Sequence, residues 1–302
     1  MNHVAHVVKK AYHLGVAIPA FNVPYLPMVE PVVRAVVDAD SFAMIESARL
    51  EWLKFEAKGP AEVSEEFNQW VNPDHISLHL DHIPVIDEDN QHVDFFPIFE
   101  KAIQCGYQSV MIDGSRLDLS GNIAATKKAV DLAHQSGIPC EAELGAVMGH
   151  EAGPMPPYEE MFSSGKGFTR IDEAQRFVAD SGCDWLSVAI GNIHGAISAG
   201  VKDKKKIAAK LNLEHLKKLR DALDIPLVLH GGSGIPQHYV LESFKCGIAK
   251  INIATEIRQA YEIALKETGQ VKTAQDATYT KTRWLIEEYF GLAGIANDVT
   301  GK

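Results

Sequence analysis

Three histidines lie at or just after the ends of short apolar runs that are far apart in the chain. His82 and His230 end two of these runs, and His194 follows a third. Imidazole nitrogen suits zinc, and three histidines with one open position are typical of a catalytic zinc site. One such histidine alone is more often a buried or surface residue without a metal. Three of them at three strand ends predict a zinc centre.

Asp81 directly precedes His82. A carboxylate there is well placed to transfer a proton to or from an oxygen held by the metal. In an extended strand, however, His79 and Asp81 share one face and His82 lies on the other. We therefore expect the chain to turn at this strand end, so that Asp81 and His82 point into the site. His79 is expected to have a structural role or to support a metal ligand from outside.

A glycine-rich segment, His230-Gly231-Gly232-Ser233-Gly234, follows one of these runs. Its glycines allow backbone N–H groups to approach an anion, and the Ser233 hydroxyl adds a donor. The next apolar run ends near Asn252 and Thr255. In a barrel of eight strands, the loops after the seventh and eighth strands form the usual phosphate site. The sequence therefore predicts a local anion site, although the chain has a formal net charge of −11.

Eight apolar, β-branched runs alternate with stretches of helical periodicity, which predicts a parallel α/β sheet. From Asn22 to Asn252, each strand–helix unit averages about 33 residues, the size of one βα repeat. The expected strands are residues 16–23, 42–46, 76–82, 109–113, 140–144, 185–190, 227–230 and 248–253. The expected helices are residues 26–38, 95–106, 122–135, 170–181, 213–222, 237–245 and 256–267, with Thr169 as an N-cap.

A closed (β/α)8 TIM barrel is favoured over the alternative, a doubly wound open sheet. Polar residues stand at the C-terminal end of nearly every expected strand, where TIM barrels carry their chemistry. No Pro-, Gly- or Ser-rich linker divides the chain, so we expect residues 1–302 to form one domain. Two segments are longer than the usual connections between strands and helices. Residues 145–166 have the composition of a mobile active-site loop, and residues 195–211 form a basic excursion.

The composition argues against several classes of partner and location. With 29 Lys and Arg against 40 Asp and Glu, the chain is not expected to bind nucleic acid or an anionic membrane. The longest apolar runs, such as residues 16–21, are too short to cross a bilayer, and the N-terminus lacks the layout of a signal peptide. Four widely spaced cysteines without a CxxC motif are expected to be reduced thiols. We therefore expect a cytoplasmic protein.

Six segments together resemble the motifs of class II fructose/tagatose-bisphosphate aldolases, in the order of that family and over nearly the whole chain. The resemblance implies a zinc-dependent (β/α)8 enzyme that reversibly splits a phosphorylated ketose into dihydroxyacetone phosphate and an aldehyde. The six segments are His79-Leu80-Asp81-His82, Met111-Ile112-Asp113-Gly114-Ser115, Glu141-Ala142-Glu143-Leu144-Gly145, Ala189-Ile190-Gly191-Asn192-Ile193-His194-Gly195, His230-Gly231-Gly232-Ser233-Gly234 and Lys250-Ile251-Asn252-Ile253-Ala254-Thr255-Glu256.

The resemblance also implies residue roles. Asp81 would protonate or deprotonate the hydroxyl at C4, and Glu151, on the loop after Glu143, would exchange the proton at C3. Asp113 and Glu143 would be outer or alternative carboxylates of the metal site. The residues implied at the metal are His82, His194, His230, Glu143 and Asp113.

The same resemblance implies how the substrate is held. A sodium or potassium ion often assists phosphate binding in this family, and a homodimer or homotetramer is expected. Arg258 matches an arginine that reaches the second phosphate, often across a subunit interface. The residues implied in substrate binding are Asn22, Ser47, Gly195, Gly231, Gly232, Ser233, Asn252, Thr255 and Arg258.

The chain departs from the family pattern on the side of the aldehyde. Ser198 stands where the family usually has a lysine that contacts phosphate. Ala254 replaces an aspartate of fructose-bisphosphate enzymes and matches the tagatose type. These changes leave the expected metal chemistry intact, so the acceptor aldehyde need not be glyceraldehyde 3-phosphate. An aldolase for another ketose 1-phosphate, with a non-phosphorylated aldehyde, is therefore an alternative.

Three further functions fit these residues less well. A zinc hydrolase on the same barrel usually has an HxH pair on the first strand, where this chain has Phe21-Asn22-Val23. A Schiff-base aldolase needs a lysine inside the barrel, whereas the expected sixth strand has none and Lys250 lies at the beginning of the eighth. A non-catalytic subunit of an aldolase is expected to have lost ligands, and here the three histidines and both acid–base carboxylates are present.

Overall fold

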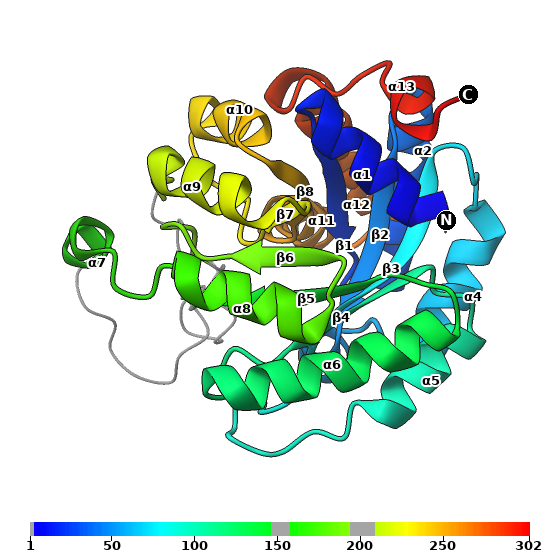
Figure 1. Ribbon diagram of the computed structural model, residues 1–302. Helices are drawn as coiled ribbons and strands as arrows, with labels where there is room; N and C mark the ends of the chain where they lie inside the picture. The colour runs from blue at the N-terminus through cyan, green and yellow to red at the C-terminus, as the bar shows by residue number, and fades with distance from the viewer. Residues whose placement is uncertain (1–2, 146–157, 194–208) are drawn as a thin grey trace.

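The computed structural model describes residues 3–145, 158–193 and 209–302, without the side chain of Met161. Eight parallel strands pair in sequence order, and β8 pairs with β1 to close the barrel (Figure 1). This confirms the expected (β/α)8 architecture and excludes the open sheet. The strands are β1 (Ile18–Asn22), β2 (Ala43–Ala48), β3 (Ile76–Pro84), β4 (Ser109–Asp113), β5 (Cys140–Leu144), β6 (Trp185–Val188), β7 (Leu227–Leu229) and β8 (Ile248–Ile253).

Helices surround the barrel as an outer layer (Figure 1). Those that the sequence predicts are α2 (Val29–Asp38), α5 (Phe96–Gln104), α6 (Leu119–Gln135), α8 (Ile171–Ser181), α9 (Leu213–Leu223), α10 (Gln237–Lys245) and α11 (Thr255–Thr268). Those that it does not predict are α1 (His3–Leu14), α3 (Arg49–Lys54), α4 (Pro60–Trp70), α7 (Tyr158–Ser164), α12 (Val271–Trp284) and α13 (Ala296–Thr300). No helix in the described ranges is long and apolar enough to cross a membrane.

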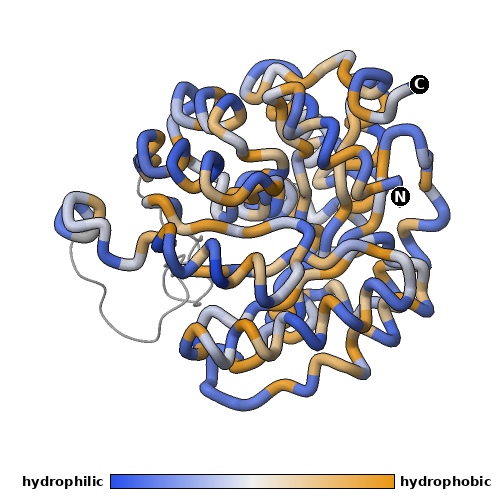
Figure 2. The backbone as a smooth tube through the Cα atoms, viewed as in Figure 1, coloured by the Kyte–Doolittle hydropathy of each residue, from blue (hydrophilic) through white to orange (hydrophobic). Residues whose placement is uncertain are grey.

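Two apolar clusters explain why the strands are apolar on both faces. The larger cluster lies between the barrel and the helices and includes Ile45 of β2. The smaller lies inside the barrel, where Met44 of β2 and Trp185 of β6 pack with Val4 and Val7 of α1. Helix α1 therefore closes the N-terminal end of the barrel. Figure 2 shows hydrophobic residues along the central strands and hydrophilic residues along much of the outer helices.

The structure refines one local prediction and contradicts another. The expected helix at residues 26–38 begins with a short 3₁₀ turn, Leu26–Met28, before α2. Thr169 does not cap α8, whose N-cap is Arg170 without a side-chain cap bond. Instead, the Thr169 hydroxyl donates to the carbonyl of Leu144 and accepts from the amide of Ala189. A tertiary link between the ends of β5 and β6 replaces the local cap that the sequence favoured.

Candidate metal centre

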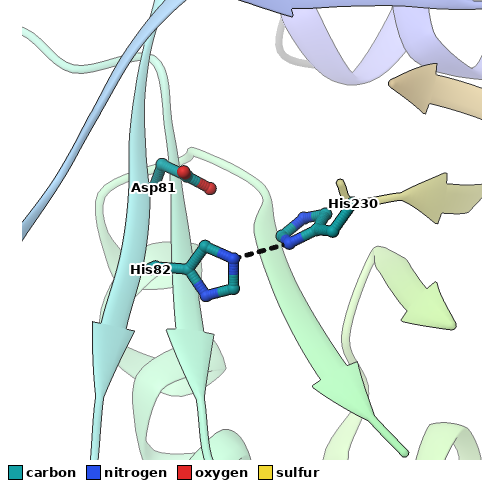
Figure 3. A group of neighbouring side chains, drawn as sticks. All are labelled: Asp81, His82 and His230. Carbon is teal, nitrogen blue, oxygen red and sulfur yellow. Dashed lines mark hydrogen bonds between the residues drawn. The ribbon is translucent and has the colours of Figure 1, made fainter. Parts of the chain in front are cut away.

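The expected turn at the end of β3 is present. Leu80 of β3 pairs with Val110 of β4, and Ile83 pairs with Ile112. Between these two pairs β3 advances by three residues and β4 by two, so β3 carries one extra residue. Within this bulge His82 has a φ of 31°, a left-handed conformation that is rare outside glycine. The bulge reverses the alternation of side chains, and Asp81 and His82 both project toward His230 at the end of β7 (Figure 3).

The two histidines present their nitrogens to each other. Nε2 of His82 and Nδ1 of His230 lie 2.6 Å apart. Each ring is held from behind by a carboxylate: Nδ1 of His82 lies 3.2 Å from Asp113, and Nε2 of His230 lies 2.8 Å from Glu141. A carboxylate behind an imidazole places the proton on that side, so that the opposite nitrogen is the one that can bind a metal. The two inward nitrogens therefore have the geometry of a pair of metal ligands.

Asp81 lies beside this pair and is held at both oxygens. Asn22 donates to Oδ2 at 2.9 Å and Asn252 donates to Oδ1 at 3.0 Å. Burial alone would raise the pKa of Asp81, but the neighbouring His82 and His230 lower it below its usual value. Asp81 is therefore a carboxylate, and its two amide donors fix its orientation at the end of β3.

Glu143 and Asp113 add two carboxyl groups to the same end of the barrel. Glu143 lies 3.4 Å from the inward nitrogen of His230, whereas Asp113 lies behind His82 and accepts from the Ser115 hydroxyl at 2.6 Å. Burial and the nearby charge of Asp113 raise the pKa of Glu143 well above its usual value. A divalent cation would relieve this repulsion, so the donor set of two imidazoles and adjacent carboxylates suits a metal.

The structure brings together only part of the expected metal set. Asp81, His82 and His230 have ligand atoms within 4.8 Å of one another, and so do His82, Asp113 and Glu143. His194 and the acid–base candidate Glu151 lie outside the described residues, as do Gly195 and Ser198. His79 is buried against the Ser109 hydroxyl, 2.8 Å from its Nδ1, which fits the expected structural role.

The loop after β7 and the start of α11 lie next to each other. The amide of Gly232 donates to the carbonyl of Asn252 at 3.1 Å, and a Cβ on Gly232 would press against the Ile251 side chain. Only glycine lets the two loops approach this closely. The Ser233 hydroxyl is buried and has no hydrogen-bond partner among the described residues. Thr255 begins α11, whose N-terminal amides favour an anion.

Three other residues expected to bind substrate are in contact with other side chains of the chain. Asn22 donates a hydrogen bond to Asp81 and is part of the candidate metal centre. Ser47 is fully buried and accepts a hydrogen bond from the Trp52 indole at 2.7 Å. Arg258 forms an ion pair with Glu262 and lies over the ring of Phe55, so its guanidinium is engaged within the chain.

The structure places inside the barrel a lysine that the sequence argument had placed only at the beginning of the eighth strand. Lys250 is fully buried in the lumen and forms ion pairs with Glu46 at 3.2 Å and Glu141 at 3.0 Å. Burial alone would lower the pKa of Lys250, but these carboxylates raise it above its usual value. The group is an ammonium ion and not a free amine, which disfavours Schiff-base chemistry on grounds of charge.

The sequence contains a signal for this network. Lys250 and Asn252 alternate with Ile251 and Ile253 of the outer cluster, so both polar side chains share the inner face of β8. Glu141 similarly alternates with the outer Ala142 on β5. Charged residues on the inner face of an otherwise apolar barrel strand indicate a buried ion pair or a functional site.

The protein-family comparison matches residues 2–295 to the family described as fructose-bisphosphate aldolase class-II. The chain belongs to the class II fructose-bisphosphate aldolase family. The facing histidines His82 and His230 and the neighbouring Asp81 lie within the residues that the family match covers.

Individual relatives agree with this assignment. A curated protein of Escherichia coli K12, described as uncharacterized protein YdjI, is 44% identical over 185 residues, which is 61% of this chain and 61% of that protein. The match thus spans less than two thirds of that relative. The crystal structure of the YdjI aldolase is 30% identical, with a TM-score of 0.76 over 97% of this chain and 98% of that one.

A more distant structure supports the fold alone. Fructose-bisphosphate aldolase from Campylobacter jejuni is 18% identical, with a TM-score of 0.70 over 95% of this chain and 94% of that one. The closed barrel is therefore shared with proteins of much lower sequence similarity.

Proposed function

We propose that this family member is a zinc-dependent aldolase that reversibly cleaves a phosphorylated ketose to dihydroxyacetone phosphate and an aldehyde. The observation that carries the proposal is the pair of facing nitrogens of His82 and His230, each oriented by a carboxylate, with Asp81 beside them. Fructose 1,6-bisphosphate and tagatose 1,6-bisphosphate are the first candidate substrates.

In this proposal His82 and His230 hold the zinc, together with His194 and with Glu143 as an alternative ligand. Zinc at this position would supply Lewis-acid polarisation of the substrate carbonyl. Asp81 would hold and transfer the proton of the C4 hydroxyl, because its carboxylate is ionised, oriented at both oxygens and adjacent to the two imidazoles.

The phosphate of the dihydroxyacetone half would lie between the loop after β7 and the N-terminus of α11. The buried hydroxyl of Ser233, which has no hydrogen-bond partner among the described residues, supports this placement, because such a group costs free energy unless a ligand or water satisfies it. The close packing of Gly232 on β8 brings backbone amides into the same region. Local dipoles can bind an anion here despite the acidic balance of the chain.

A specific observation favours a second candidate, cleavage of a ketose 1-phosphate that yields a non-phosphorylated aldehyde. The arginine implied at the second phosphate, Arg258, is 5% exposed and is neutralised by Glu262. A second phosphate would have to break this ion pair. An uncharged aldehyde end would not.

The test is a panel of ketose phosphates that includes both bisphosphates and several 1-monophosphates, with dihydroxyacetone phosphate release as the readout. Zinc-loaded enzyme is compared with enzyme treated with a chelator and then restored with zinc. We expect cleavage that is lost on chelation and regained with zinc, and a preference within the panel decides between the two candidates. If the zinc-loaded protein releases no dihydroxyacetone phosphate from any member, the proposal is wrong and a non-catalytic subunit becomes the better explanation.

A further inference from the structure

Lys250 is the centre of a buried polar network that lies below the candidate metal centre. Its ammonium donates to Oδ1 of Asn252 at 2.7 Å and forms ion pairs with Glu141 and Glu46 at 3.0 and 3.2 Å. The side chains of Lys250, Glu141 and Glu46 are fully buried. An ammonium ion has three N–H donors, and three acceptors surround this one. All three donor directions are therefore fixed by the barrel.

The first branch of the network leads to the metal ligand. Oε2 of Glu141 faces Lys250, and Oε1 accepts from Nε2 of His230 at 2.8 Å. While the ammonium holds Glu141 in this orientation, His230 carries its proton on Nε2 and directs Nδ1 to His82. The orientation of a metal-binding imidazole depends on such a partner.

The second branch leads to the acid–base carboxylate. An amide side chain has an oxygen that accepts and a nitrogen that donates, and rotating it by half a turn exchanges them. Because Lys250 requires an acceptor, Asn252 turns its oxygen to the ammonium and its nitrogen to Oδ1 of Asp81 at 3.0 Å. The ammonium and the carboxylate of Asp81 thus select the same orientation of the amide, and without the ammonium the contact with Asp81 alone would have to maintain it.

We infer that Lys250 is a positioning residue that orients two parts of the site at once: the metal ligand His230, through Glu141, and the carboxylate Asp81, through Asn252. The inference rests on the proposed metal centre. A lysine is suited to this position because its compact ammonium can serve three acceptors converging from different strands, β2, β5 and β8.

The network also explains why a second cluster of potential ligands is not a second cation site. Glu46, His79 and Asp81 have ligand atoms within 4.8 Å of one another. The ammonium of Lys250 already lies 3.2 Å from Glu46, so a metal ion there would meet a fixed positive charge.

The test compares a charge-balanced double variant with a matched single variant. Lys250→Met together with Glu46→Gln removes one positive and one negative group, so Glu46 is not left buried without its partner. Glu46→Gln alone is the control, because Glu46 contacts Lys250 but neither His230 nor Asn252. The readouts are the affinity of the metal-free protein for Co²⁺, followed by visible absorbance, and the kcat and KM of the metal-saturated enzyme.

We expect the control to bind Co²⁺ as the unmodified protein does, and the double variant to bind it about 10- to 100-fold more weakly. With saturating metal, kcat of the double variant is expected to fall while KM changes little. Equal Co²⁺ affinity and equal kcat in the double variant and the control would overturn the inference. Failure of the unmodified protein to bind Co²⁺ would instead overturn the proposed metal centre.

A third variant separates the two branches and covers the case in which the double variant does not fold. Glu141→Gln leaves Lys250 paired with Glu46 and bonded to Asn252, and removes the carboxylate that links Lys250 to His230. We expect weaker Co²⁺ binding and an altered Co²⁺ spectrum, with a smaller loss of kcat at saturating metal than in the double variant. Unchanged Co²⁺ affinity and an unchanged spectrum in this variant would contradict the branch through Glu141.

Discussion

Replacing Asp81 with asparagine tests the assignment of the acid–base group most directly. The carboxylate accepts from Asn22 at one oxygen and from Asn252 at the other. An asparagine has one oxygen, so one of the two amide donors would meet an N–H group. The substitution keeps the size of the side chain and removes its charge and one acceptor.

The magnitudes follow from these contacts. A buried donor that loses its acceptor costs about 1–3 kcal/mol, and the loss of a buried charge offsets part of this cost. We therefore expect the free energy of unfolding to fall by about 1–3 kcal/mol. The loss of a positioned acid–base group lowers turnover by about 10²–10⁴-fold, which corresponds to about 3–5 kcal/mol of transition-state stabilisation. Since the catalytic loss exceeds the stability loss, it remains measurable well below the unfolding temperature.

The assay measures kcat for dihydroxyacetone phosphate release, bound zinc and thermal unfolding in the same preparation. Asp81→Asn should retain zinc, because the two imidazoles and the carboxylates behind them are unchanged. Glu46→Gln is the control, since Glu46 is an equally buried carboxylate on the neighbouring strand whose side chain, unlike that of Asp81, accepts no hydrogen bond from the Asn22 or Asn252 amides. Turnover of Asp81→Asn equal to that of the control would refute the acid–base role, and loss of zinc would show that Asp81 is a metal ligand.

Three further predictions concern stability. Gly114→Ala would place a Cβ against Oδ1 of Asn122, whose nitrogen donates to the carbonyl of Glu143 at 2.9 Å. We expect the free energy of unfolding, measured with denaturant, to fall by about 1–3 kcal/mol. An unchanged unfolding midpoint would show that Asn122 moves at no cost. Burial raises the pKa of Glu51 from its usual 4.5 to about 8, so the folded protein retains a proton that the unfolded chain releases and stability falls as pH rises between these values. Glu51→Gln should therefore gain stability relative to the unmodified protein by about 1.4 kcal/mol per pH unit across this window, and a pH-independent difference in unfolding free energy would contradict the argument. Removing zinc with a chelator should lower the unfolding temperature, by the equivalent of about 4 kcal/mol if zinc is present at 1,000 times its dissociation constant; calorimetry that shows no shift would argue against a bound metal.

The sequence determined the architecture and most of the residues at the C-terminal end of the barrel. Alternating apolar runs and helical stretches predicted eight strands, and polar residues such as Asn22, Asp113 and Asn252 marked the ends that carry the site. These signals are local, because burial on both faces of a strand and the period of a helix are written in neighbouring residues. Helix α1 was missed although Val4, Val7, Val8 and Ala11 stand at helical spacing; its place at the end of the barrel depends on the tertiary structure.

The tertiary structure decided which polar groups meet and how they are oriented. The pattern of β3 showed that Asp81 and His82 could not both point inward without a turn, but the bulge itself arises from the register between β3 and β4. The contacts of Lys250 with Glu141 and Glu46 join residues that are 109 and 204 positions apart in the chain. Alternation along a strand gives the face on which a side chain lies. Its partners depend on the stagger of the strands in the closed barrel, and this stagger determines which nitrogen of each histidine faces the metal centre.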